Sequence, residues 1–93
     1  MAFARVVSFE GVTSDRVAQL QQEMQGEPPE GMSPTEILML HDPGTEKSLV
    51  IIVFDTEEDY ARGDEVLSAM PAGDTPGRRT SVTKYEVAAR RSM

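Results

Sequence analysis

The segment from Ser48 to Phe54 constrains the fold most, because almost every residue in it is apolar. Successive side chains of a strand point to opposite faces of a sheet, so a strand of this composition needs both of its faces covered. Strands of this kind lie in the interior of a sheet rather than at its edge. The sequence therefore predicts a central strand over Ser48–Phe54 that is covered on both sides.

Three other segments have the alternation of strands, and two have the spacing of helices. The further strands are expected over Phe3–Phe9, Thr35–His41 and Thr80–Ala88. The helices are expected to begin near Thr13 and at Thr56, whose hydroxyl groups can cap free backbone N–H groups. Apolar residues recur on one face of each helix: Val17, Leu20 and Met24 in the first, and Tyr60, Gly63, Leu67 and Met70 in the second.

Proline and glycine mark the connections between these elements. The segment Gly26–Pro34 is expected to be a loop. Asp42-Pro43-Gly44 has the residues of a tight turn, which predicts a hairpin between the second and third strands. Pro71-Ala72-Gly73 is expected to end the second helix, and the basic tail Arg90-Arg91 is expected to fray.

The element order is therefore βαββαβ, within a single domain over residues 1–93. With right-handed crossovers, this order predicts an α+β fold of the ferredoxin-like type. Its four-stranded antiparallel sheet has the spatial order 4-1-3-2, with two helices on one face. The strands Phe3–Phe9 and Ser48–Phe54 have apolar residues on both faces, however, and the helices cover only one. We therefore expect a homodimer in which the open sheet faces pack together.

The element order, the two-faced sheet and the capped segment Phe54-Asp55-Thr56-Glu57-Glu58-Asp59-Tyr60-Ala61 resemble the dimeric α+β barrel superfamily. This superfamily includes the antibiotic-biosynthesis monooxygenase-like proteins, and the resemblance covers most of the chain. It implies a back-to-back dimer in which any pocket lies between the sheet and the helices of the same subunit. Members include cofactor-independent oxygenases of aromatic substrates, haem-degrading enzymes and small isomerases.

Composition excludes several kinds of metal and cofactor site. The chain has no cysteine and one histidine, which excludes disulfides, thiolate metal sites and a two-histidine site within one chain. The haem-degrading relatives use a helix-borne histidine together with an asparagine and a tryptophan, and this chain has neither asparagine nor tryptophan. We therefore expect no metal and no cofactor.

Charge and hydropathy indicate which partners are excluded. With 16 acidic and 9 basic residues, the chain has a net charge of −7 and is poorly suited to bind the phosphate backbone of a nucleic acid. Lys47–Phe54 has the basic start and the terminal aromatic of an RNA-recognition strand, but Leu49 and Ile51 replace the aromatic residues that stack on bases. The apolar run Leu49–Phe54 is far shorter than a membrane span, and the first residues do not show the charged segment followed by an apolar one that is typical of a signal peptide. We expect a cytoplasmic protein without nucleic-acid or membrane partners.

Arg5 is the first candidate site residue, because it shares an apolar strand face with Phe3 and Val7. A buried cation needs a partner of opposite charge. One interpretation is structural: Glu86 on the neighbouring last strand, or a carboxylate of the second subunit, pairs with Arg5. The other interpretation is functional: the guanidinium group clamps an anionic ligand.

His41 and Tyr60 are the other candidates for a ligand pocket. The imidazole of His41 either acts as a ligand or general base, or forms a hydrogen bond to the Asp42-Pro43-Gly44 turn that follows it. Tyr60 has a hydroxyl on an apolar helix face, so it either lines a hydrophobic pocket or belongs to the core. No catalytic residue is assigned.

Basic residues are concentrated at the end of the chain: five of the nine cations follow Gly77, where Glu86 is the only acid. This basic segment either meets an acidic surface across the dimer or forms a solvated tail.

The expected function is that of a homodimeric small-molecule-binding or regulatory protein of the dimeric α+β barrel type, with a small apolar or aromatic ligand. The resemblance implies an alternative. In that alternative the chain is a cofactor-independent, monooxygenase-like or isomerase-like enzyme that acts on an aromatic or polyketide-like metabolite.

Overall fold

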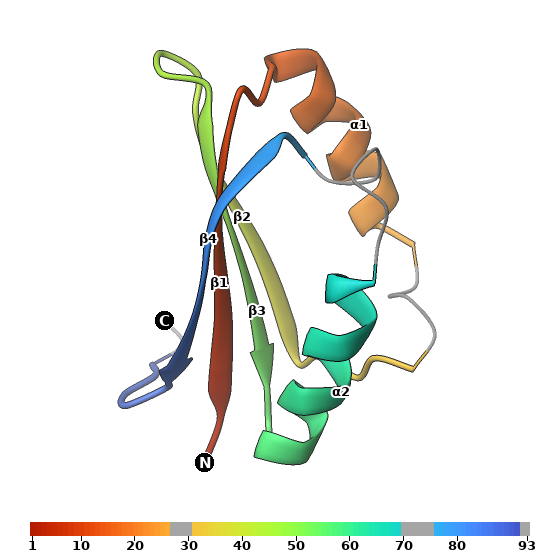
Figure 1. Ribbon diagram of the computed structural model, residues 1–93, viewed down its shortest axis with the longest axis vertical. Coiled ribbons are helices and arrows are strands. Elements are labelled where there is room, and N and C mark those ends of the chain that lie inside the picture. The colour runs from red at the N-terminus through yellow and green to blue at the C-terminus, as the bar shows by residue number, and fades with distance from the viewer. Residues whose placement is uncertain (27–30, 70–75, 92–93) are drawn as a thin grey trace.

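The computed structural model describes residues 1–26, 31–69 and 76–91, and its elements follow the predicted order. The strands are β1 (Phe3–Glu10), β2 (Glu36–Asp42), β3 (Lys47–Phe54) and β4 (Arg78–Glu86), and the helices are α1 (Ser14–Met24) and α2 (Glu57–Ser68). The strands form one antiparallel sheet in the order β2-β3-β1-β4. Both helices lie on the same side of this sheet (Figure 1). The predicted α+β fold, with its ferredoxin-like order and its strand arrangement, is confirmed.

The element bounds differ from the predicted ones mainly in the last strand. β4 runs from Arg78 to Glu86, so it begins and ends two residues earlier than predicted. The β1–β4 pairing shifts register between Ser8 and Phe9, which is the signature of a β-bulge. The bulge adds one residue to β4, so Glu10 pairs with Arg78 rather than with Arg79. Met70 and Pro71-Ala72-Gly73, which were predicted to complete and end α2, lie outside the described residues.

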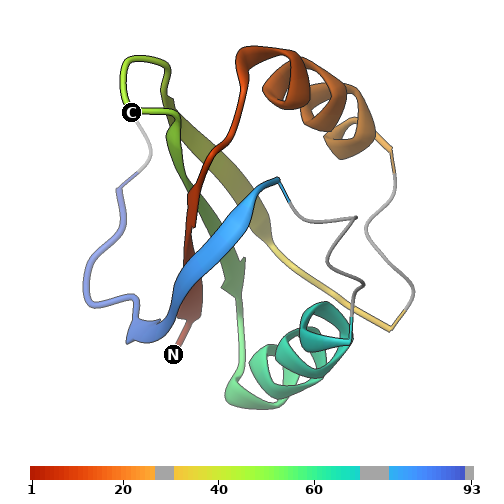
Figure 2. The same ribbon diagram turned by 45° about the horizontal axis from the view of Figure 1, so that its top comes forward.

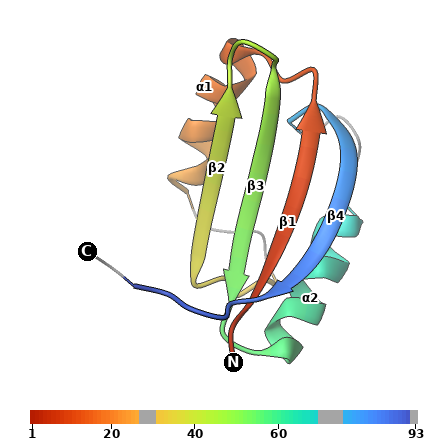
Figure 3. The same ribbon diagram turned by 90° about the vertical axis from the view of Figure 1, so that its left-hand side faces the viewer.

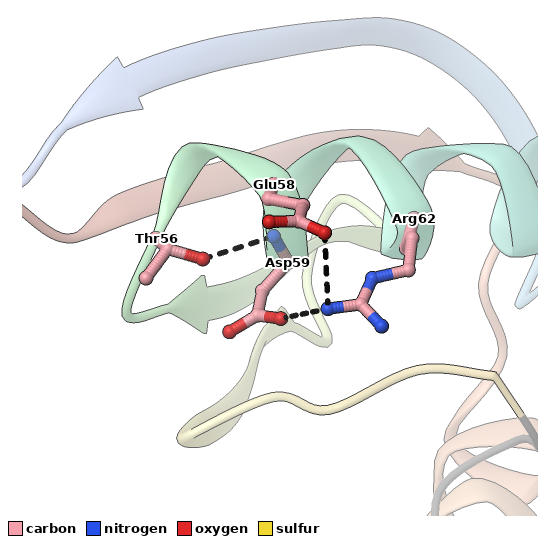
Figure 4. A network of polar contacts seen from close by, with 4 residues as sticks. All are labelled: Thr56, Glu58, Asp59 and Arg62. Carbon is pink, nitrogen blue, oxygen red and sulfur yellow. Dashed lines mark hydrogen bonds and ion pairs between the residues drawn. The ribbon is translucent and has the colours of Figure 1, made fainter.

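α2 begins at the predicted N-cap, Thr56. The hydroxyl of Thr56 accepts a hydrogen bond from the backbone N–H of Asp59 at 3.0 Å. Arg62, one turn later, pairs with the carboxylates of Asp59 at 2.7 Å and Glu58 at 4.0 Å (Figure 4). Carboxylates in a first turn stabilise the positive end of the helix dipole. The acidic residues at this position therefore serve the helix start, and among the described residues no three potential metal ligands form a group.

α1 is capped but weakly packed. The hydroxyl of Thr13 accepts a hydrogen bond from the backbone N–H of Arg16, yet none of the described residues of α1 is buried. Met24, predicted on its apolar face, is 41% exposed. α1 lies toward the β2–β3 hairpin and α2 toward the opposite end of the sheet (Figures 1 and 2). The two helices thus cover different parts of the same sheet face.

The buried apolar side chains on this face form two clusters. We call the first the α2 cluster, because it includes Tyr60 of α2; it consists of Met32, Ile52, Phe54 and Tyr60. We call the second the α1 cluster, because α1 packs against it; it consists of Val7, Phe9 and Val12. Val17 of α1 packs against the α1 cluster. Val50, at the middle of β3, packs against both clusters but is itself only partly buried. The helix-covered face therefore has a partly exposed apolar floor between the clusters.

Gly63 allows α2 to pack closely on the sheet, and its replacement by alanine is expected to destabilise the protein. A Cβ atom at Gly63 would lie 2.3 Å from Cζ of Phe54, a fully buried ring. We expect Gly63→Ala to lower the free energy of unfolding by about 1–2 kcal/mol, because overpacking outweighs the gain of about 1 kcal/mol in helix propensity. Urea denaturation measures this loss.

The matched control for this substitution is Gly26→Ala. Gly26 is exposed, and the nearest atom to a Cβ added there is 3.4 Å away. We expect the free energy of unfolding of this variant to lie within about 0.5 kcal/mol of that of the unmodified protein. Equal stability of the two alanine variants would contradict the close packing of α2 on Phe54.

In the described part of the chain, no helix covers the other face of the sheet (Figure 3). We call this surface the open face. Strand register sets its side chains in rows. Two of these rows are Leu38, Ile51, Val6 and Thr83, and Leu40, Leu49, Ser8 and Ser81; a third is Glu36, Val53, Ala4 and Tyr85. Leu38 is 43% exposed and Leu40 is 49% exposed. Large apolar side chains on the open face are therefore left in contact with solvent.

The segment after β4 crosses one end of the open face toward β2 (Figure 3). The backbone N–H of Val87 donates to the carbonyl of Ala2 at 2.9 Å, and Arg90 pairs with Glu36. The prediction that the tail frays is therefore wrong for Arg90. Two more cations of the basic segment also pair within the chain, Arg78 with Glu10 and Lys84 with Glu57.

Within the described residues, every helix is too short or too polar to cross a membrane.

Candidate functional site

Arg5 lies on the helix-covered face, near the middle of β1. It is opposite Ile52 on β3 and opposite Lys84 on β4, so it occupies an interior position of the sheet. Its side chain is 4% exposed. A guanidinium group this deeply buried has lost its water and depends on protein groups, or on a ligand, for hydrogen bonds.

Asp64 of α2 is the charged partner of Arg5. The Nε–H of Arg5 donates to Oδ1 of Asp64 at 2.8 Å. The prediction of Glu86 as the partner is therefore wrong, because strand register sets Glu86 opposite Phe3. Asp64 comes from the helix packed above the sheet, a contact that strand alternation could not reveal. Its carboxylate is 44% exposed, so one member of the pair remains in contact with water.

The second end of the Arg5 guanidinium group lacks a partner. Nη2 is buried and has no hydrogen-bond partner among the described residues. An unsatisfied buried donor costs about 1–3 kcal/mol, and more when the group is charged. The site therefore has an unused hydrogen-bond donor at its floor.

Lys84 is the cross-strand neighbour of Arg5 and is held by the same helix. Its Nζ lies 3.1 Å from the carboxylate of Glu57 and about 5 Å from two aromatic rings, 4.8 Å from the centroid of Phe3 and 5.0 Å from that of Tyr60. Like charges on adjacent strands repel each other. The two α2 carboxylates, Glu57 and Asp64, neutralise this pair of cations and link α2 to β4 and β1.

Tyr60 lies between these two ion pairs and belongs to the α2 cluster. Its ring is 7% exposed and packs edge-on against Phe54 and Phe3, with centroids 5.7 Å and 6.4 Å away. Burial, followed by the negative charge of Asp64, raises the pKa of the phenol above its ordinary value of 10.0, although Arg5 and Lys84 oppose this shift. Tyr60 is therefore a neutral phenol at physiological pH.

His41 lies away from the other two candidates. Its Nδ1 is 2.7 Å from Oγ of Ser48 across the β2–β3 hairpin, so the predicted bond to the following turn is wrong. Its Nε2 is buried and has no partner among the described residues. Ser48 and Ile52, which stand opposite His41 and Arg5, are four residues apart on β3, or about 13 Å along the strand. Arg5 and Tyr60 thus share a site that His41 does not reach.

Two hollows formed by described residues lie near the hairpin end of the sheet. The first, of about 500 Å³, is lined by Ser8, Phe9, Glu10, Leu40, His41, Asp42, Lys47, Ser48, Leu49 and Thr80. The second, of about 510 Å³, is lined by Glu10, Gly11, Thr45, Lys47 and Arg78. Neither lining includes Arg5 or Tyr60, so these hollows are separate from the Arg5 site.

No family model and no curated protein matches this chain. The fold and the geometry around Arg5 are therefore the basis for a functional proposal.

Two residues of the site, Asp64 and Lys84, were not singled out from the sequence. Asp64 carried a usable signal, because it lies four residues after Tyr60 and directly after Gly63, on the helix face predicted to meet the sheet. A carboxylate at that position indicates a buried cation opposite it. Lys84 carried no comparable signal, because its relation to Arg5 depends on strand register.

Proposed function

We propose that the chain is a homodimeric small-molecule-binding protein of the dimeric α+β barrel type, with one ligand site on the helix-covered face of each subunit. The observation that supports this proposal is the split core. Val50 lies on a central strand, where side chains are normally the most buried, yet it remains partly exposed between the α1 cluster and the α2 cluster. The ligand binds over Val50 and completes the core.

The residues beside Val50 suit an apolar ligand. Met39 is its cross-strand partner on β2, and Ile37 is next to it on the same face; both are partly buried. Methionine adapts its shape to an irregular ligand. None of the described residues of α1 is buried, so α1 can move aside at small energetic cost to admit a ligand.

Dimerisation through the open face is the second part of the proposal, and the apolar rows on that face support it. Leu38 and Leu40 expose large apolar side chains beside Ile51 and Leu49, which are partly exposed. The tail crosses the face at the end where Arg90 pairs with Glu36, whereas Leu38 and Leu40 remain 43% and 49% exposed. A second copy of the chain offers the same apolar rows, so that both subunits lose the exposed surface.

The distribution of charge also favours a second copy on the open face. Its two ends carry three carboxylates and three cations, so they balance: Glu10, Glu36, Asp42, Lys47, Arg78 and Arg90. The net charge of −7 lies mostly elsewhere, because α2 alone has five carboxylates and one arginine. Two open faces therefore meet without repulsion, while the acidic helices point away from the interface.

Binding of ethylbenzene tests the ligand site, with NMR of ¹³C-labelled valine and isoleucine methyl groups as the readout. We expect saturable shifts at Val50 and Ile37, with a dissociation constant of about 0.1–1 mM for a ligand of this size. Val50→Phe fills the floor and is expected to abolish the shift at Ile37, whose methyl groups remain in this variant. Ala61→Phe, at an exposed position on α2, is the control and is expected to leave the shifts at Val50 and Ile37 unchanged. Absence of saturable shifts, or unchanged binding by Val50→Phe, refutes the site.

A further inference from the structure

The charge balance around Arg5 bears on the kind of ligand that this site accepts. Arg5 is neutralised by Asp64 at 2.8 Å, and Lys84 is neutralised by Glu57 at 3.1 Å. A ligand therefore meets two cations and two anions, and the site has no excess positive charge. Asp64 thus removes the excess positive charge on which an anion clamp at Arg5 would depend.

The free donor of Arg5 still requires a hydrogen-bond acceptor. Nη2 is buried and without a partner among the described residues, on a side chain that is 4% exposed. Arg5 is opposite Ile52 on β3, and Val50 is the next residue of β3 on the same face. Arg5 and Val50 are therefore diagonal neighbours, which lie about 7–8 Å apart in an antiparallel sheet. An arginine side chain spans that distance. A molecule seated over Val50 can thus present an oxygen atom to Nη2.

Two kinds of oxygen acceptor differ in their effect on the charge of the site. A carboxylate brings a second anion to a guanidinium group that Asp64 already neutralises, and it must lose its water in apolar surroundings. A carbonyl oxygen accepts the same hydrogen bond without adding charge. Burial, followed by the negative charge of Asp64, raises the pKa of Tyr60, so these surroundings disfavour another anion.

We infer that Asp64 determines ligand specificity at this site, which accepts an uncharged apolar molecule carrying a carbonyl-type oxygen and rejects the corresponding carboxylate. The oxygen accepts a hydrogen bond from Nη2 of Arg5, and the apolar body covers Val50. This inference rests on the proposed ligand site and adds the chemical class of its occupant.

Three probes of nearly equal shape test the inference: ethylbenzene, acetophenone and benzoate. By methyl NMR titration, we expect acetophenone to bind about tenfold more tightly than ethylbenzene, because it gains one hydrogen bond from a charged donor. We expect benzoate to bind at least about tenfold more weakly than acetophenone. If acetophenone binds no better than ethylbenzene, or if benzoate binds as well as acetophenone, the inference is refuted.

Substitutions at the ion pair separate the roles of its two members. Asp64→Asn keeps an acceptor for Nε but leaves Arg5 with a net charge, so benzoate affinity is expected to rise by about tenfold. Arg5→Met removes the donor, so acetophenone is expected to lose its advantage over ethylbenzene. An unchanged benzoate affinity in folded Asp64→Asn refutes the role of Asp64. If that variant does not fold, the Arg5→Met comparison decides, because a retained acetophenone preference refutes the inference.

Failure of the inference and failure of the proposed function give different results. If ethylbenzene does not bind at all, the ligand site itself is refuted. If ethylbenzene binds at Val50 but the affinities of the three probes do not differ as expected, the ligand site is supported and the inferred ligand class is refuted.

Discussion

We expect Leu38→Asp to convert a dimer of this chain into a monomer. Leu38 is 43% exposed and lies in the apolar row of the open face, next to Ile51. Twofold symmetry brings two copies of each interface residue into the dimer, so the substitution buries two carboxylates without partners. Each costs about 1–3 kcal/mol, which together weaken dimerisation by on the order of 100-fold or more. Multi-angle light scattering across a range of protein concentrations measures the change in mass.

Met24→Asp is the matched control for this experiment. Met24 is 41% exposed, almost as much as Leu38, but lies on α1, on the other side of the sheet. Its replacement is expected to leave the dimer mass unchanged. If the unmodified protein is a monomer at every concentration, or if Leu38→Asp dimerises as strongly as the control, the open face is not the interface.

Arg5 and Asp64 form an ion pair, and we expect removal of one partner to change the free energy of unfolding far more than removal of the other. Asp64→Ala leaves the buried Arg5 guanidinium group without a counter-charge. Loss of one partner of a buried pair typically costs about 3–5 kcal/mol. Because Asp64 is 44% exposed, we expect a smaller loss of about 2–3 kcal/mol in the free energy of unfolding. Arg5→Met removes the buried charge and its unsatisfied donor together. We expect the free energy of unfolding of this variant to lie within about 1 kcal/mol of that of the unmodified protein, or above it.

Urea denaturation at neutral pH measures both effects. Glu65→Ala, which removes the exposed carboxylate next to Asp64 on α2, is the control and is expected to change stability by less than about 0.5 kcal/mol. Equal losses in Asp64→Ala and Arg5→Met would mean that the pair itself stabilises the fold, and that burial of Arg5 is not the dominant cost.

The fold could be predicted because its main signals are local. Apolar residues on both faces of Ser48–Phe54 gave the central strand, Thr56 gave the start of α2, and Asp42-Pro43-Gly44 gave the hairpin that joins the two middle elements. The bounds of β4 were less accurate, because they depend on the partner strand: Phe3 and Glu10, the two ends of β1, pair with Glu86 and Arg78.

The candidate site could be predicted only in part. Arg5 and Tyr60 were both singled out, and the structure brings them together with Asp64. His41 was singled out with them but lies at the other end of the sheet, bonded to Ser48. Spacing along a chain defines which face a residue occupies, whereas the distance between residues on one face depends on strand order and register.

The sequence by itself determined the order of the elements, the central position of β3, the apolar character of both sheet faces and the presence of a cation on one of them. These properties follow from side-chain periodicity and capping, which act over a few residues. Only the tertiary structure decided that Asp64 neutralises Arg5, that Nη2 remains without a partner among the described residues, and that the core divides on either side of Val50. These properties depend on how α1 and α2 dock on the sheet, and docking brings together residues such as Arg5 and Asp64 that are distant in the chain.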